Sequence, residues 1–235
     1  MKLAVVCVTY NRPQQLGQMI RCFERQDYAD RELVILDDAG QYQPTEGQRW
    51  RLMPVARRFA TLGEKRNAAA RLVSPDTEAL AVWDDDDLYM PWALRASAAA
   101  LQRAAWSRPS LVLHPLSDGA LRQHRTGGLF HSGWAYRRAA FEHSGGYPAI
   151  NNGEDQALAA RFAQFGVADC DPLQLGFPPF LVYPWQGGRH LSWSGPAGYQ
   201  RWGRQIIRPA AVTPSESPLR LEKANILPEV YERMF

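Results

Sequence analysis

The 235 residues are 46% hydrophobic, which is enough to bury one substantial core. With 27 basic and 24 acidic residues, the charge is too mild to indicate a nucleic-acid-binding protein on that ground alone. Three widely spaced cysteines favour a reduced protein over a disulfide framework, and no run of about 18 apolar residues predicts a membrane span. We expect a cytoplasmic protein and leave peripheral membrane contact open.

Apolar runs and amphipathic segments alternate through the first 105 residues. The apolar runs predict strands at 3–8, 32–36, 55–60 and 79–83. Apolar residues at a period near 3.6 predict helices from residue 13, at 64–73 and at 91–105. Such alternation predicts an α/β fold in which helices flank a mainly parallel, Rossmann-like sheet. Ligands bind at the carboxyl ends of the strands in such sheets.

The second part of the chain, from residue 106, is richer in glycine, proline and aromatic residues. It predicts strands at 111–113 and 133–136 and a helix at 156–165. Prolines at positions 209, 214 and 218 then interrupt regular structure. We therefore expect one domain over residues 1–208 and a tail over 209–235 that either folds back or mediates association.

Four consecutive aspartates, 84–87, follow the predicted strand at 79–83. Adjacent carboxylates repel one another unless water or a cation neutralises them. A hard divalent ion such as Mg²⁺ or Mn²⁺ takes oxygen ligands and would fit here. The alternative is a solvated acidic turn before the helix near Pro91, for which Asp87 would provide the cap.

Two predicted helices begin with polar motifs. Arg66 and Asn67 lie in the first turn of one, where helix amino-terminal amides and an arginine form an anion site. The alternative is an ordinary surface helix. Glu154 and Asp155 precede the other, where acids favour the helix start.

Taken in order, these motifs resemble glycosyltransferase family 2, whose members have the GT-A fold. The resemblance extends over roughly residues 3–192 and implies a nucleotide-sugar half at 1–105 and an acceptor half at 106–208. The family often has Gly-Ser after its paired aspartates, whereas this chain has Ala39 and Gly40. Lys65 and Ala69 also depart from the family's helix start.

The resemblance assigns contacts to the donor. Asp38 is expected to accept a hydrogen bond from the pyrimidine ring. The other residues expected to bind the donor nucleotide are Thr9, Tyr10, Asn11, Arg66, Asn67, Asp84 and Asp85. A divalent ion, Mn²⁺ or Mg²⁺, would bridge the diphosphate and neutralise its charge as it leaves.

Asp86 is the chief predicted ligand of this ion, with Asp84 and His190 as further ligands. For His190, a surface loop histidine is an equally good interpretation. Arg189 beside it would pair with phosphate.

An inverting transferase needs one carboxylate to take the proton from the attacking hydroxyl. The resemblance assigns this role to Asp155, with Glu154 beside it, and His131 is a candidate for contact with the acceptor. Aromatic residues of the acceptor half either stack on sugar rings or pack in the core; these are Trp134, Trp185 and Trp193. Three arginines that share a helical face would touch a diphosphate, an acidic acceptor or only water; they are Arg201, Arg204 and Arg208.

We therefore expect an inverting glycosyltransferase that moves a sugar from a nucleoside-diphosphate sugar, UDP-linked, to an acceptor hydroxyl. A nucleotidyltransferase that makes sugar nucleotides would need a glycine-rich loop after the first strand, which residues 9–13 lack. A non-catalytic nucleotide or sugar binder on the same scaffold remains an alternative. So does a transferase acting on a modified nucleic-acid base, for which binding would depend strongly on salt.

Overall fold

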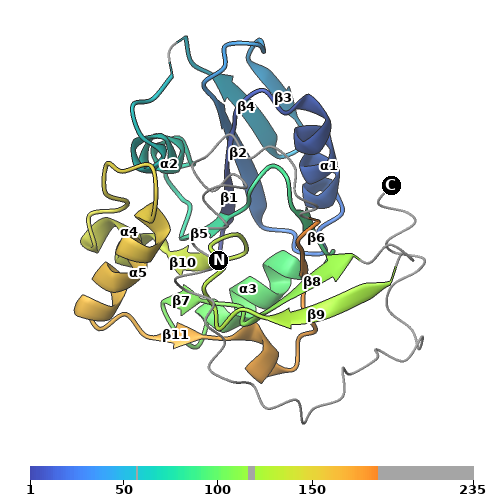
Figure 1. Ribbon diagram of the computed structural model, residues 1–235, viewed down its shortest axis with the longest axis vertical. Coiled ribbons are helices and arrows are strands. Elements are labelled where there is room, and N and C mark those ends of the chain that lie inside the picture. The colour runs from blue at the N-terminus through green and yellow to red at the C-terminus, as the bar shows by residue number, and fades with distance from the viewer. Residues whose placement is uncertain (57, 116–119, 185–235) are drawn as a thin grey trace. The chain divides into compact units, whose positions relative to one another are not determined.

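The computed structural model describes residues 1–56, 58–115 and 120–184 (Figure 1). They belong to one compact unit, Met1–Pro184. Several predicted residues lie outside the described part: Trp185, Arg189, His190, Trp193, Arg201, Arg204, Arg208 and the tail at 209–235. Their predicted roles stay predictions, as does the domain boundary at residue 208.

An eight-stranded sheet forms the centre of this unit, in the order β11-β7-β10-β5-β1-β2-β4-β3. Its strands are β1 (Leu3–Thr9), β2 (Arg31–Asp37), β3 (Thr45–Gly47), β4 (Trp50–Pro54), β5 (Ala79–Val82), β7 (Trp106–Ser107), β10 (Ala135–Arg137) and β11 (Asp169–Cys170). β1 pairs in parallel with β2 and β5, whereas β10 runs antiparallel to β5 and β7. The predicted α/β class is confirmed, and the sheet is mixed, with a parallel centre.

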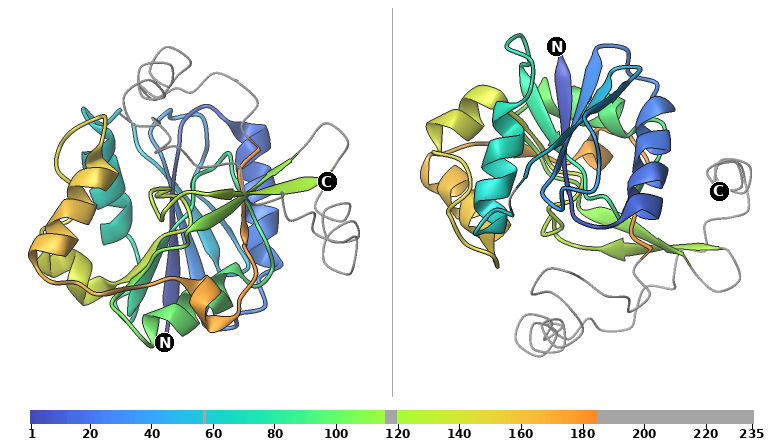
Figure 2. Two further views of the ribbon diagram at one scale, coloured as in Figure 1. Left: turned by 60° about the horizontal axis from the view of Figure 1, so that its bottom comes forward. Right: turned by 90° about the horizontal axis from the view of Figure 1, so that it is seen from above.

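Helices cover both faces of this sheet, with α1 and α2 on opposite sides (Figure 2). They are α1 (Pro13–Glu24), α2 (Leu62–Arg71), α3 (Ala93–Leu101), α4 (Arg138–His143), α5 (Glu154–Gln164) and the 3-10 helix η1 (Pro172–Leu175). Successive strand residues face opposite sides of a sheet. Val6 and Val34 accordingly share one buried cluster with Ala69 of α2 and Leu158 of α5.

A second sheet has four strands in the order β6-β12-β8-β9. They are β6 (Leu88–Tyr89), β8 (Leu111–Pro115), β9 (Leu121–Arg125) and β12 (Leu181–Val182). Only β8 was predicted, because β6 and β12 have two residues each and β9 is mostly polar. The rings of Trp83 and Tyr89 stack at 3.8 Å between centroids, so β6 is packed against the end of β5.

The strand predicted at 55–60 is wrong. β4 takes its place, pairing with β2 as far as Pro54 opposite Asp37. The chain then leaves the ladder, and the N–H of Phe59 donates to the Asp38 carboxylate at 3.1 Å. Val55 and Phe59 pack against the core from a loop, so their apolar character reflects burial and not strand pairing.

The three cysteines are free and buried, in agreement with the expectation of a reduced protein. Within the described ranges, no helix is both long and apolar enough to span a membrane.

Candidate active site

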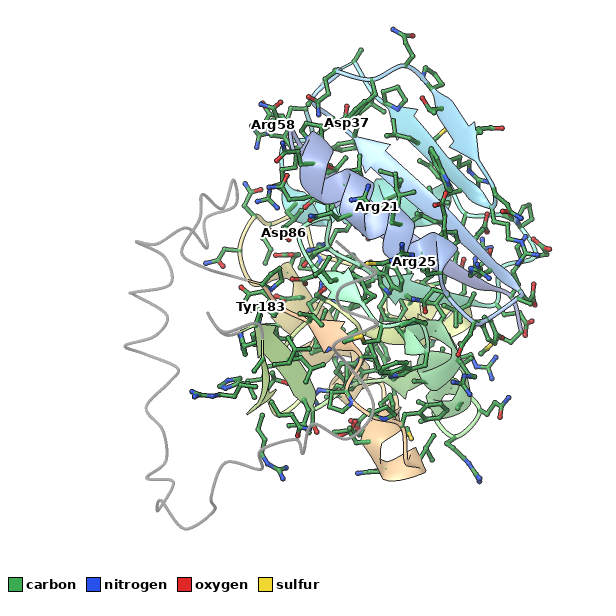
Figure 3. All side chains as sticks on the ribbon, turned by 90° about the vertical axis from the view of Figure 1, so that its right-hand side faces the viewer. Arg21, Arg25, Asp37, Arg58, Asp86 and Tyr183 are labelled. Carbon is green, nitrogen blue, oxygen red and sulfur yellow. The ribbon has the colours of Figure 1, made fainter. Side chains whose placement is uncertain are left out.

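The carboxyl ends of β2, β1 and β5 bring the predicted donor-side residues together. Thr9, the last residue of β1, pairs with Asp37, the last residue of β2. The N–H of Trp83, just after β5, donates to the Val6 carbonyl of β1 at 3.2 Å. The four aspartates that follow Trp83 therefore lie next to the end of β1. Figure 3 labels Asp37, at the end of β2, and Asp86, in the turn after β5.

The four aspartates alternate between partly exposed and buried positions. The side chains of Asp84 and Asp86 are 32% and 31% exposed, whereas Asp85 and Asp87 are 4% and 2% exposed. Solvent therefore reaches the first and third carboxylates, and the second and fourth are held inside the protein.

Asp85 is tied to the first strand and the loop after it. The Thr9 hydroxyl donates to its Oδ2 at 2.6 Å, and Arg12 donates to its Oδ1 at 2.9 Å. Burial, together with the charge of Asp86, raises the pKa of Asp85 to about 6, against the lowering effects of Arg12 and Thr9. Both oxygens of Asp85 are thus engaged by protein groups, which points to an anchoring role for this residue.

Asp87 does not cap the following helix, which excludes the role that the alternative interpretation gave it. α3 begins after Trp92, and no side chain caps it. Burial, followed by the charges of Asp86 and Asp84, raises the pKa of Asp87 well above its ordinary value. Asp87 is therefore a buried residue of the turn, with its carboxyl group inside the protein.

Arg12 was not predicted as a site residue. It follows β1 in the loop before α1, and its Nη1 lies 2.9 Å from Asp85 Oδ1 and 2.7 Å from Asp86 Oδ2. The preceding Asn11 has a φ of 56°, a left-handed conformation that asparagine tolerates better than most residues. The only signal in the sequence was a cation just beyond a strand that neighbours four carboxylates.

Lys65 was also missed. It lies in the first turn of α2, where its ammonium donates to Asp38 Oδ1 and, at 2.6 Å, to the Thr9 carbonyl. Lys65 and Asp38 are both buried. Burial lowers the pKa of Lys65, and Asp38 opposes that shift. In the sequence, Lys65 stands out only as a departure from the family's helix start.

The end of β2 offers acceptor oxygens beside an aromatic ring. Asp38 already accepts from Lys65 and Phe59, and a carboxylate has lone pairs for further bonds. The buried Oδ2 of Asp37 has no hydrogen-bond partner among the residues that the structure describes. The guanidinium of Arg58 lies 4.0 Å from the centroid of the Tyr10 ring. These groups suit a planar base with N–H donors.

Arg66 connects the two halves of the site. Its Nη2 donates to Asp84 Oδ1 at 3.1 Å, and its Nε donates to Glu154 Oε1 at 3.3 Å. Glu154 opens α5 after Gly153, whose φ is 76°. Burial, together with Asp155 and Asp84, raises the pKa of Glu154, while Arg66 lowers it.

Asp155 is the next residue of α5. It is partly exposed, and its Oδ1 accepts from the N–H of Gln156 at 2.8 Å. Arg66 therefore links the first turn of α5, which carries Asp155, to the aspartate turn.

Asn67 has a different position from the one predicted. Its amide nitrogen donates to the Tyr147 carbonyl at 2.8 Å, and its amide oxygen accepts from the Tyr147 N–H at 2.9 Å. The amide thus joins α2 to the loop before α5. Gly63 allows the same close approach, because a Cβ there would lie 1.8 Å from the Pro148 carbonyl oxygen.

His131 and Trp134 are core residues. The Nε2 of His131 lies 2.7 Å from the Tyr147 hydroxyl, and burial, with the charge of Arg66, lowers the pKa of His131 well below its ordinary value. Trp134 is fully buried and donates to the Gly128 carbonyl at 2.9 Å. Neither side chain presents a surface to an acceptor.

The aspartate turn has the chemistry of a partial metal site. In the described ranges, no group of three or more His, Cys, Asp or Glu side chains is arranged to hold a metal ion. Mg²⁺ and its relatives are often held by one or two carboxylates together with substrate phosphates. Asp84 and Asp86 are partly exposed oxygen donors beside two buried aspartates of raised pKa, so they fit such a site.

Comparisons with known proteins identify the family of this chain. The model of the family described as Glycosyl transferase family 2 matches residues 4–145. A Bacillus subtilis (strain 168) protein described as the uncharacterized glycosyltransferase YwdF is 28% identical over 108 residues, which are 44% of this chain and 40% of that protein.

Two groups of solved structures have the same fold. TarS 1–349 of S. aureus in complex with UDP-GlcNAc has a TM-score of 0.58 at 17% identity, covering 81% of this chain and 60% of that one. The mannosyltransferase PcManGT of Pyrobaculum calidifontis, in complex with GDP-Man and Mn²⁺, has a TM-score of 0.57 at 18% identity, covering 81% and 58%. The chain therefore spans less than two thirds of the length of these relatives.

Proposed function

Because this chain belongs to glycosyltransferase family 2 and has the GT-A fold, we propose that it is an inverting glycosyltransferase. It transfers a sugar from a nucleoside-diphosphate sugar to an acceptor hydroxyl, with a divalent ion bound. The donor is UDP-linked, as supported by the similarity to a TarS structure that holds UDP-GlcNAc. The protein acts in the cytoplasm, which agrees with its three free thiols.

One observation carries this proposal: Arg66 contacts Asp84 of the donor-side turn and Glu154 of the acceptor-side helix at the same time. An inverting transfer requires the leaving diphosphate and the base to lie on opposite sides of one sugar ring. The contacts of Arg66 support the proposal, because Asp84 belongs to the turn that also carries Asp86, and Asp155 follows Glu154.

The chemistry follows from these positions. Asp155 takes the proton of the acceptor hydroxyl as its oxygen bonds to the anomeric carbon. The bond from that carbon to the diphosphate oxygen breaks, and its electron pair leaves with the diphosphate, so the anomeric configuration inverts. Asp86 and Asp84 would hold a divalent ion, which would supply charge neutralisation at the leaving group. Thr9, Tyr10, Asn11 and Asp38 hold the nucleoside.

Donor turnover tests the proposal. The protein is incubated with UDP-, GDP- and dTDP-sugars in Mn²⁺ or Mg²⁺, and release of the nucleoside diphosphate is measured, with the anomeric configuration of the product read by NMR. We expect UDP-sugars to be consumed with inversion. Binding of UDP without consumption of any donor, over a broad acceptor panel, would favour a non-catalytic binder, and retention of configuration would exclude Asp155 as the proposed base.

A further inference from the structure

A guanidinium of the protein already contacts the carboxylate assigned to the metal ion. Arg12 Nη1 lies 2.7 Å from Asp86 Oδ2 and 2.9 Å from Asp85 Oδ1. Arg66 contacts Asp84 at 3.1 Å. Two arginines, one before α1 and one in α2, thus contact three carboxylates of the turn.

Arg12 and a divalent ion compete for Asp86. Arg12 contacts the Oδ2 of that carboxylate, and two cations within a few ångströms repel strongly in a partly buried site. The side chain of Arg12 is 17% exposed, so little water screens this repulsion. An ion therefore binds Asp86 more weakly while Arg12 stays in place.

Departure of Arg12 leaves the start of α1 intact, and the charge of an incoming ion replaces that of the guanidinium beside the turn. Arg12 precedes α1, and its side chain makes no capping hydrogen bond to that helix. Asp85 keeps its bond from the Thr9 hydroxyl at 2.6 Å when Arg12 leaves. A displaced guanidinium needs a new anionic partner, and a diphosphate is one that it binds with two parallel hydrogen bonds.

We propose that Arg12 makes divalent-ion binding at the aspartate turn conditional on the donor. In the ligand-free protein Arg12 holds Asp86, and it transfers to the donor diphosphate when donor and ion bind together. Arg12 is then a donor-binding residue as well as the internal counter-cation of the site. The identity of its anionic partner rests on the proposed function.

Equilibrium binding of Mn²⁺ tests this inference, with free Mn²⁺ measured by electron paramagnetic resonance. Wild-type protein, Arg12→Gln and Arg21→Gln are titrated with and without UDP, after correction for Mn²⁺ bound by UDP alone. Arg21 is exposed on α1 (Figure 3) and serves as the matched control.

Wild-type protein should bind Mn²⁺ about tenfold more tightly, or better, with UDP than without it. Without UDP, Arg12→Gln should bind Mn²⁺ about tenfold more tightly than wild type, and Arg21→Gln should match wild type. The double variant Arg12→Gln/Asp86→Asn should lose the increase in Mn²⁺ affinity that Arg12→Gln shows without UDP.

Equal affinities of wild type and Arg12→Gln without UDP would overturn the inference, as would a gain that survives loss of the Asp86 carboxylate. The UDP dependence of the wild type tests it even if Arg12→Gln fails to fold. Failure of the proposed function has a different signature: no donor would be turned over, while the shifts in Mn²⁺ affinity would remain measurable.

Discussion

Arg66 Nε lies 3.3 Å from Glu154 Oε1, a contact between the first turn region of α2 and the first residue of α5. The two side chains are 10% and 7% exposed. A buried ion pair of this kind is most costly when one partner is removed, because the other charge is left without compensation. The position of the acceptor-side helix therefore depends on a residue of the donor-side half.

Arg66→Met should lower the free energy of unfolding by about 3–5 kcal/mol, because Glu154 and Asp84 lose their shared cation. Denaturant unfolding measures this loss. Arg71→Met, an exposed arginine at the end of the same helix, is the control and should change stability by no more than about 0.5 kcal/mol. Equal losses in the two variants would mean that the Arg66 contacts contribute little.

Lys65→Met should destabilise the protein by about 3–5 kcal/mol, since it leaves the Asp38 carboxylate buried without its cation. Adding Asp38→Asn should recover part of this loss, because the uncompensated charge is then gone. A double-mutant cycle by chemical denaturation measures the coupling. If the effects of the two substitutions simply add, Lys65 and Asp38 are not energetically linked.

Gly63→Ala should destabilise the protein by about 1–3 kcal/mol, because its Cβ would lie 1.8 Å from the Pro148 carbonyl oxygen. Gly17→Ala in α1 is the matched control. Among the described residues, a Cβ at Gly17 would meet only Arg21, at 3.7 Å, so this variant should gain up to about 1 kcal/mol from helix propensity. Thermal unfolding compares the two. An unchanged stability of Gly63→Ala would show that the loop before α5 shifts to accommodate the Cβ at little cost.

Glu32→Gln should reduce stability by about 1–3 kcal/mol at neutral pH. Burial opposes ionisation of Glu32, but hydrogen bonds from Thr77 and Ser74 and the charge of Arg51 outweigh it, so the pKa is lowered below its ordinary value of 4.5. A carboxylate of lowered pKa stabilises the folded state fully above that ordinary value. The contribution is lost as the pH falls through the folded pKa.

The free energies of unfolding of wild type and Glu32→Gln are therefore compared between pH 7 and pH 3. Their difference should shrink as the pH falls. Glu46→Gln, an exposed acid of the edge strand β3, provides the control at each pH. A difference for Glu32→Gln that is constant with pH would mean that the carboxylate charge is not what stabilises the fold.

The donor-side half was largely predictable because its strands are apolar runs and its motifs stand at strand ends. β1, β2 and β5 appear close to their predicted bounds. Local sequence could not reveal the second sheet, in which two strands have only two residues each and depend on partners far away in the chain. The strand predicted at 55–60 is wrong for a related reason. Tertiary packing buries apolar residues of this loop, and a short apolar run looks like a strand in the sequence.

Within the site, residue types were easier to predict than partners. The four aspartates were recognised as a group, but the sequence does not show that Asp85 and Asp87 are buried. Arg12 and Lys65 were missed because the partners of their ion pairs lie far away in the chain, and such pairs produce no periodic pattern in the sequence. Asn67 was expected at the donor and instead bonds to Tyr147, because its partner comes from the acceptor-side half.

The most direct test of the account compares Asp155→Asn with wild type in two assays on the same preparations: donor turnover, and the affinity for UDP with Mn²⁺. Asparagine keeps an oxygen that can accept from the Gln156 N–H, so α5 should be unchanged, and Glu142→Gln, an exposed acid of α4, is the control. Turnover by Asp155→Asn should fall by about 10²-fold or more, while its UDP affinity stays that of wild type. Turnover near the wild-type rate would contradict the assignment of Asp155 as the base and with it the proposed mechanism.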